Sequence, residues 1–355
     1  MSDDPLNPYR AKIDAVDDTL LRLLNERAAL AREIGRLKNG SAYRPEREAQ
    51  ILRRMREQNP GPLSPEAISK VFREIISACL ALEKSLSVAY LGPPGTFSES
   101  AAVAHFGHAA ELRDCASIDE VFREVEASAS DYGLVPVENS SGGAVGRTLD
   151  LTAQTPLKIC GEVMLRVHHH VMSRAEALAD VKKIYSHAQS FAQCHEWLNR
   201  NLPGVPRIPV ESNALAASMA ANETGAAAIA GEAAAERYQL PILARNIEDE
   251  PENTTRFWVI GQHDAGRSGV DKTSVVMGAA NRPGAMYELL EPLSKYGVSM
   301  SRLESRPSRA ALWEYLFFVD IEGHREDDAV AAALSELAGK AAFLKILGSY
   351  PCAMN

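Results

Sequence analysis

The sequence has 355 residues, of which 46% are hydrophobic, and its 38 basic and 47 acidic residues leave a net charge of -9. This length allows two or three domains with cores of their own, and the acidic balance argues against a general nucleic-acid or polyanion binder. No apolar run approaches the roughly 18 residues of a membrane span, the N-terminus lacks a secretory signal, and the five cysteines form no C-x-x-C pair. We therefore expect a cytoplasmic protein with reduced thiols, no membrane contact and no zinc ribbon.

Residues 1–86 are predicted to be helical. Apolar residues recur at steps of three and four along 7–38, and further helices are predicted over 45–58 and 65–86. The first helix would be about 45 Å long, which is too long to be covered by a small single-chain core. We therefore expect an all-α domain of three helices that forms a dimeric helical bundle.

Two cations, Arg27 and Lys38, share the apolar stripe of the first helix, counted from Leu20 at about 100° per residue. An unpaired buried cation is costly. The stripe must therefore face either protein carboxylates, such as Glu48 and Glu83, or an anionic ligand. A helical pocket rich in arginine suits a small dicarboxylate, because guanidinium grips carboxylate in a bidentate manner.

The helical segment resembles the chorismate mutase family over YRAKIDAVDDTLLRLLNERAALAREIGRLK, YRPEREAQIL and FREIISACLALEK. The resemblance implies the pericyclic rearrangement of chorismate to prephenate, which needs positioning and charge stabilisation but no nucleophile. It implies that Lys38 points at the ether oxygen and that Glu48 holds the substrate hydroxyl. At Glu83 the best-known bacterial members have Gln, so we expect the protonated form of Glu83 to be the working one. The implied site comprises Arg10 (from the partner subunit), Arg27, Lys38, Arg44, Arg47, Glu48, Cys79 and Glu83.

From residue 87 to 263 strands and helices alternate, which indicates α/β layers with a largely parallel sheet. The predicted strands are VAYLG, YGLVPV, KICGEVMLRVHHHVMS, KIYSH, IPVES, GAAAIAG and RFWVIG. The motif GPPGT lacks the lysine of a nucleotide-binding P-loop. The histidines at 168–170 alternate along a strand and complete no metal pattern, so we expect ordinary packing and no metal.

Three strand–loop–helix stretches offer hydroxyls and backbone N–H groups at helix N-termini: LGPPGTFSES, VPVENSSGGAV and YSHAQSFAQ. Together with ENTTRFWVIG they resemble the prephenate dehydratase family. The resemblance implies two α/β lobes around a cleft, as in periplasmic binding proteins, with Thr255 essential and Arg256 on a substrate carboxylate. Simple helix capping is the alternative for each polar loop residue. The implied site comprises Thr96, Ser98, Glu138, Asn139, Ser140, Ser186, His187, Gln189, Thr255, Arg256 and Phe257.

After a polar linker at 262–271, residues 272–355 follow the order βαββαβ of the ferredoxin-like split unit. This segment resembles ACT domains, small-molecule regulatory modules, and two of its stretches match those that bind phenylalanine in dehydratases. Ordinary turns are the alternative for both stretches. The implied effector site comprises Arg282, Pro283, Gly284, Ala285, Met286, Glu304, Ser305, Arg306 and Pro307.

Together the resemblances predict domains at 1–86, 87–263 and 272–355, and one chain that converts chorismate to prephenate and then to phenylpyruvate. Phenylalanine is expected to inhibit it, no cofactor is expected, and the predicted assembly is a homodimer or a higher homo-oligomer. Two alternatives stay open. One is a dehydratase whose helical segment serves only dimerisation, and the other is a non-catalytic amino-acid sensor.

Overall fold

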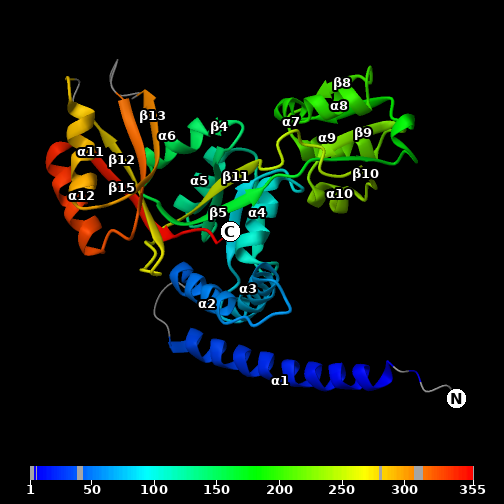
Figure 1. Ribbon diagram of the computed structural model, residues 1–355, viewed down its shortest axis with the longest axis horizontal. Helices are drawn as coiled ribbons and strands as arrows, with labels where there is room; N and C mark the ends of the chain where they lie inside the picture. Colours follow the sequence, from blue (N-terminus) through cyan, green and yellow to red (C-terminus); the bar gives the residue numbers. More distant parts are fainter. Residues whose placement is uncertain (1–3, 5, 38–42, 280–281, 308–314, 355) are drawn as a thin grey trace.

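The computed structural model describes residues 4, 6–37, 43–279, 282–307 and 315–354. Figure 1 shows three regions along the chain: an N-terminal group of helices, a central α/β region and a C-terminal α/β region. The predicted order of fold types is therefore confirmed. No helix within the described ranges is both long and apolar enough to cross a membrane.

The N-terminal region consists of α1 (Asn7–Leu37), α2 (Pro45–Glu57) and α3 (Pro65–Ala81). Proline opens both α2 and α3, where a missing N–H costs nothing, and the Ser64 hydroxyl caps α3 by accepting from Ala67 N at 3.1 Å. The third helix ends at Ala81 rather than near Leu86, so Glu83 lies in the turn that follows it. Helix α1 extends beyond the other two helices (Figure 1), contacts α3 and buries none of its residues.

The first lobe of the central region is built on a sheet of order β2-β1-β3-β11-β5, with β4 paired to β3. Strand β1 is parallel to β2 and β3, whereas β11 is antiparallel to β3 and β5. Its strands are β1 (Ser87–Leu91), β2 (Glu111–Cys115), β3 (Tyr132–Asn139), β4 (Gly143–Ala144), β5 (Lys158–Arg166) and β11 (Thr254–Gly261). Its helices are α4 (Phe97–Phe106), α5 (Ile118–Glu126) and α6 (Gly146–Gln154).

The second lobe has a sheet of order β10-β6-β9-β7-β8, in which β7 is parallel to β8 and β9 and β6 is antiparallel to β9 and β10. Its strands are β6 (His170–Ser173), β7 (Lys183–Ser186), β8 (Arg207–Pro209), β9 (Ala226–Ala230) and β10 (Ile242–Ala244). Its helices are α7 (Ala188–Gln193), α8 (His195–Asn201), α9 (Asn213–Ala221) and α10 (Glu232–Tyr238), besides a 3-10 turn at Leu178–Asp180. Two chain crossings, after β5 and before β11, join the lobes.

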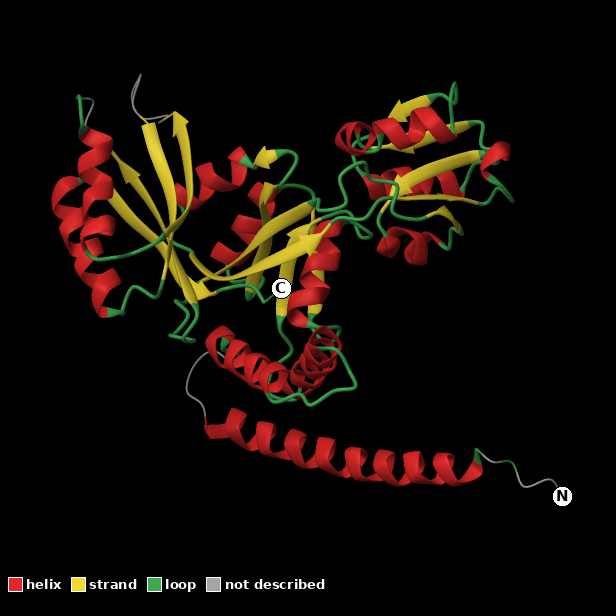
Figure 2. Cartoon of the chain, in the orientation of Figure 1, coloured by secondary structure: helices red, strands yellow, loops and turns green. Residues whose placement is uncertain are grey.

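The C-terminal region forms an antiparallel sheet of order β13-β14-β12-β15, with two helices on one face (Figure 2). Its elements are β12 (Asp271–Gly278), α11 (Ala285–Lys295), β13 (Met300–Pro307), β14 (Tyr315–Glu322), α12 (Asp328–Lys340) and β15 (Phe343–Pro351). The predicted βαββαβ order is confirmed. Strand β15 lies so close to β5 that a Cβ on Gly348 would collide with the backbone of Ile159.

Two predictions about the central region are wrong. The run 158–173, read as one strand, is divided between β5 of the first lobe and β6 of the second, because the chain crosses between lobes at Val167–His169. The sheets are mixed rather than largely parallel, because β11 returns to the first lobe and pairs antiparallel with both neighbours. The division of the Ala-rich stretch into helix, strand and helix is confirmed as α9, β9 and α10.

Candidate active sites and effector stretches

A cavity of about 830 Å³, here called the helical pocket, opens between α1, α2 and α3. Arg27 lines it together with Ala31 and Ile34, which follow at steps of four and three residues on one face of α1. The structure brings most of the residues implied by the mutase resemblance to this pocket: Arg27, Arg44, Arg47, Glu48, Cys79 and Glu83.

The ends of the helices position these side chains. Arg47 and Glu48 stand in the first turn of α2, directly after the Pro45 that starts it. Glu83 packs against α1 at Gly35, where a Cβ would lie 2.8 Å from Glu83 Cγ. Any larger residue at position 35 would therefore push α1 away from the end of α3.

Two residues of the implied mutase site are not in the helical pocket. Arg10 is exposed near the start of α1 and pairs with Asp4 at 2.8 Å. At 1.5 Å per residue, it stands about 25 Å along the helix from Arg27. Lys38 lies outside the described residues.

Glu48 lies where the helical pocket meets the central region. Burial raises the pKa of its carboxyl from 4.5 to about 7, although the charge of Arg73 on α3 lowers it. Neighbouring Tyr43 is 4% exposed, and a hydrogen bond of 2.7 Å joins its hydroxyl to His105 Nε2 of α4. Burial lowers the pKa of His105 to about 3, so this imidazole is neutral at neutral pH.

The first lobe places Thr255 opposite Asn139, on adjacent strands β11 and β3. Asn139 Nδ2 donates to Thr255 Oγ1 and to Asn253 Oδ1, both at 2.8 Å. Thr255 Oγ1 therefore accepts a hydrogen bond and keeps its own proton to donate. Ser140 joins the cluster, because its hydroxyl accepts from Thr254 N at 3.0 Å.

A cavity of about 420 Å³, here called the cleft pocket, lies between this cluster and the second lobe. Asn253 and Gly142 line it from the first lobe, and Gln189 and Gln193 line it from α7. Gly142 lets the lobes approach, because a side chain there would collide with the Gln189 amide. Thr255 does not line the cleft pocket itself, but it reaches it through Asn139, whose Oδ1 accepts from Gln193 Nε2 at 3.4 Å.

Several predicted dehydratase residues hold the loops instead. Ser186 is fully buried, and its hydroxyl donates to Asn213 Oδ1 at 3.0 Å. The same Asn213 oxygen also accepts from His187 N. Thr96 is the N-cap of α4, where its hydroxyl accepts from Glu99 N, and Ser98 is buried in the first turn of that helix. For these positions the capping and packing alternative describes the geometry.

The structure contradicts the expectation that Arg256 binds a substrate carboxylate. Strand alternation turns Arg256 away from Thr255, and it lies buried against the C-terminal region, paired with Glu162 at 2.7 Å and Asp320 at 2.5 Å. Burial by itself lowers the pKa of this guanidinium, but Tyr350 and the two carboxylates raise it, so it stays charged. Phe257 is likewise removed from the cleft, because it is 1% exposed in the first-lobe core.

Glu138 also faces the C-terminal region, where it pairs with Arg302 of β13 at 2.8 Å. A second bridge joins Arg306 to Asp150 of α6 at 3.0 Å, with the Arg306 guanidinium packed on Gly146. Two predicted positions thus join the regions directly.

The two effector stretches lie at the same end of the C-terminal region, where α11 begins and β13 ends (Figure 1). Gly284 has a φ of +80° at the start of α11, a conformation that glycine adopts without strain. Arg282 is exposed and pairs with Glu288 at 2.7 Å. Glu304, Ser305 and Pro307 lie on β13, where Ser305 and Pro307 share one face of the strand and Glu304 is on the other.

Sequence reasoning missed three organising residues. Asn253 accepts a hydrogen bond from Asn139 in the first lobe, and Asn213 accepts one from Ser186 in the second lobe. Glu162 forms ion pairs with both Arg256 and Lys272. Asn253 stood within the recognised ENTTRF motif, so its place beside Thr255 was the available signal. Each of the three histidines at 168–170 has a partner of its own, and no group of metal-ligating side chains occurs in the described part of the chain.

Comparison with known families divides the chain in the same order. Residues 9–84 match chorismate mutase type II, residues 88–265 match prephenate dehydratase, and residues 273–339 match the ACT domain.

Two relatives extend along nearly the whole chain. The bifunctional chorismate mutase/prephenate dehydratase of Neisseria gonorrhoeae is 52% identical over 99% of this chain and 98% of that protein. The protein of the same name from Aquifex aeolicus is 47% identical over 99% of each chain. Among solved structures, prephenate dehydratase from Arthrobacter aurescens in complex with L-Phe has a TM-score of 0.70 and 34% identity, over 75% of this chain and 90% of that chain.

Proposed function

Because this chain belongs to the family of bifunctional chorismate mutase/prephenate dehydratases, we propose that it converts chorismate to prephenate in the helical pocket and prephenate to phenylpyruvate at the interlobe cleft. The observation that carries the first assignment is that the three arginines implied by the resemblance, Arg27, Arg44 and Arg47, line one pocket together with Arg54. Arginine forks suit the two carboxylates of chorismate.

The mutase needs a substrate held in its reactive conformation and charge stabilisation on the breaking ether. The arginines hold the carboxylates, Glu48 holds the hydroxyl, and Lys38 and Glu83 are assigned to the ether oxygen. Arg10 cannot reach Arg27 within one subunit, because about 25 Å of helix separates them. We therefore assign Arg10 to the partner's pocket, in a homodimer that also covers the apolar face of α1.

The dehydratase needs a proton for its leaving hydroxide. When the carbon–carbon bond to the ring carboxylate breaks, its electron pair enters the ring and the carbon–oxygen bond to the hydroxyl breaks. Thr255 is suited to donate that proton, because its oxygen accepts from Asn139 Nδ2 at 2.8 Å and its own O–H stays free to point at the substrate. Carbon dioxide and water then leave, and phenylpyruvate remains. The reaction needs no cofactor.

Phenylalanine is assigned to the effector stretches at 282–286 and 304–307. Feedback inhibition is supported by two ion pairs between the regions. Arg306 pairs with Asp150 of α6, and Arg302 pairs with Glu138 of β3. A ligand that repositions β13 would act through these bridges on the strand that carries Asn139.

Incubation of the purified chain with chorismate tests the assignment. We expect phenylpyruvate to form with nothing added, Thr255→Ala to stop at prephenate, and Thr255→Ser, which keeps the hydroxyl, to retain activity. A chain that used prephenate but not chorismate would be a dehydratase with a dimerisation segment. A chain that used neither but bound phenylalanine would be a sensor. Loss of both reactions in folded Thr255→Ala would contradict two separate sites.

A further inference from the structure

A third cavity, here called the interface cavity, is distinct from the helical pocket and the cleft pocket. It has a volume of about 550 Å³, within the range of small-molecule sites. All three regions line it: α2 and α3 from the N-terminal region, α4 and β5 from the first lobe, and the residues after β15 from the C-terminal region. It adjoins the helical pocket, because Tyr43 and Glu48 line both cavities.

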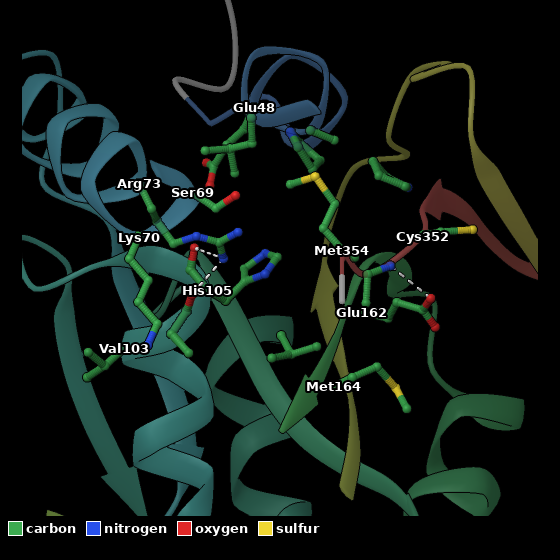
Figure 3. A pocket seen from close by; sticks show the side chains of 18 of the residues that line it. Glu48, Ser69, Lys70, Arg73, Val103, His105, Glu162, Met164, Cys352 and Met354 are labelled. Atoms are coloured by element: carbon green, nitrogen blue, oxygen red, sulfur yellow. Dashed lines mark hydrogen bonds between the residues drawn. The ribbon is translucent and has the colours of Figure 1, made fainter. Parts of the chain in front are cut away.

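One wall of the interface cavity is cationic. Lys70 and Arg73 stand three residues apart on α3, hence on one helix face, and both line the cavity (Figure 3). Arg73 donates through one terminal nitrogen to the carbonyl oxygens of Ala104 and His105, at 2.6 and 3.3 Å. These acceptors are neutral, so they satisfy hydrogen bonds of Arg73 but carry no charge that would offset its own.

The other charged groups of this wall are already engaged. Arg56 pairs with Glu66 at 3.6 Å, and Glu74 accepts from His108 at 2.9 Å. Lys70 is exposed and makes no ion pair or hydrogen bond with the part of the chain that the structure describes.

The cavity's remaining acids do not neutralise its two free cations. Glu162 is taken by Arg256, by Lys272 and by the backbone N–H of Ala353 at 3.0 Å. Glu48 makes no ion pair with the described residues, and burial raises its pKa to about 7. Within the described part of the chain, Lys70 and Arg73 therefore have no carboxylate at salt-bridge distance.

Two methionines lie across from the cations. Met164 of β5 is 43% exposed, and it lies with Met354 and Glu162 on the opposite side of the cavity (Figure 3). Methionine side chains adapt to the shape of a ligand and contact aromatic ring edges favourably. An apolar ring beside Met164 and Met354 would lie in the same cavity as Lys70 and Arg73.

We propose that the interface cavity binds a small aryl monocarboxylate, with its carboxylate on Lys70 and Arg73 and its ring against Met164 and Met354. A zwitterionic amino acid fits less well, because its ammonium group would lie near Lys70 and Arg73, which make no ion pair with the described residues. Such a ligand would contact all three regions at once and hold them in this arrangement.

Methyl groups give a local readout of this binding. Full-length protein with ¹³C-methyl methionine would be titrated with phenylacetate, and with phenylacetamide as a neutral analogue of the same shape. We expect phenylacetate to shift the Met164 and Met354 signals saturably, since a bound ring changes the shifts of nearby methyls. Met286, in an effector stretch, should stay unchanged. Phenylacetamide should bind at least tenfold more weakly.

The variant Lys70→Met, which removes one exposed cation that makes no ion pair or hydrogen bond with the described residues, should weaken phenylacetate binding at least fivefold. Its matched control is Lys182→Met, an exposed lysine of the second lobe outside the cavity, which should leave binding unchanged. Equal binding of acid and amide, or of Lys70→Met and the parent chain, would overturn the proposal. So would a response confined to Met286, or none.

Discussion

Glu48, which we propose holds the substrate hydroxyl, also affects the stability of the fold through its raised pKa. Its pKa of about 7, against 4.5 for an ordinary carboxyl, means that the folded chain binds a proton more tightly than the unfolded chain. The stabilisation is present in acid and is lost as pH rises from about 4.5 through 7. It amounts to about 3 kcal/mol, at 1.36 kcal/mol for each pKa unit.

We predict that Glu48→Gln removes most of this loss, because an amide carries no charge at any pH. Urea unfolding at pH 5 and pH 8.5 would measure it as a smaller drop in the unfolding free energy than the parent chain shows. Glu57→Gln, an exposed position at the end of the same helix, should keep the parent drop. An unchanged pH dependence in Glu48→Gln would mean that Glu48 is solvated.

The contrast between Thr255 and Arg256 marks what sequence can predict at this scale. The strand and its motif were readable from ENTTRFWVIG, and the side of the strand that faces the cleft was not. Alternation requires neighbouring residues to face opposite sides. Which side meets the C-terminal region depends on Glu162 and Asp320, 94 and 64 residues away along the chain. Local pattern carries no information about those partners.

At the scale of elements, the start of α2 is fixed from outside its own region. Tyr43 packs edge-on against Tyr132 at 5.1 Å between ring centroids and bonds to His105, so the first lobe anchors the turn before Arg44 and Arg47. The sequence predicted α2 correctly, because proline and periodicity are local signals. It could not predict this anchor, because the anchor belongs to another domain.

Tyr43→Phe should keep the ring but leave His105 Nε2 buried without its partner, at a cost of about 1–2 kcal/mol in unfolding free energy. Because Arg44 and Arg47 follow directly, we predict a several-fold rise in the KM for chorismate with little change in kcat for prephenate. Steady-state kinetics of both reactions would check this. Tyr9→Phe, an exposed tyrosine of α1, is the control. Equal damage to both reactions would point to general loosening instead.

At the scale of the whole molecule, the central and C-terminal regions share a buried charge network. Arg256 lies between Glu162 and Asp320, and Asp320 also accepts from Ser274 at 2.5 Å. Breaking a buried pair on one side leaves an uncompensated charge, which costs about 3–5 kcal/mol.

Asp320→Asn should therefore lower the unfolding free energy by about 3 kcal/mol. It should also weaken inhibition by phenylalanine, because the sheet that carries the effector stretches loses its buried ion pair with Arg256 of β11. Denaturant unfolding and inhibition curves would measure the two effects. Asp264→Asn removes an exposed pair with Arg325 near the same junction, and should cost below about 1 kcal/mol. Comparable losses in the two variants would argue against a special role for the buried network.

Helix α1 buries none of its 31 residues within its own chain, and its proposed pairing with a second chain would make the mutase reaction depend on the amount of protein present. A pocket completed by a second chain obeys mass action, whereas a cleft within one chain does not. On serial dilution, mutase turnover per chain should fall below a threshold concentration while dehydratase turnover per chain stays constant. The balance between the two steps would then depend on expression level, and prephenate supply would limit the flux when the protein is scarce.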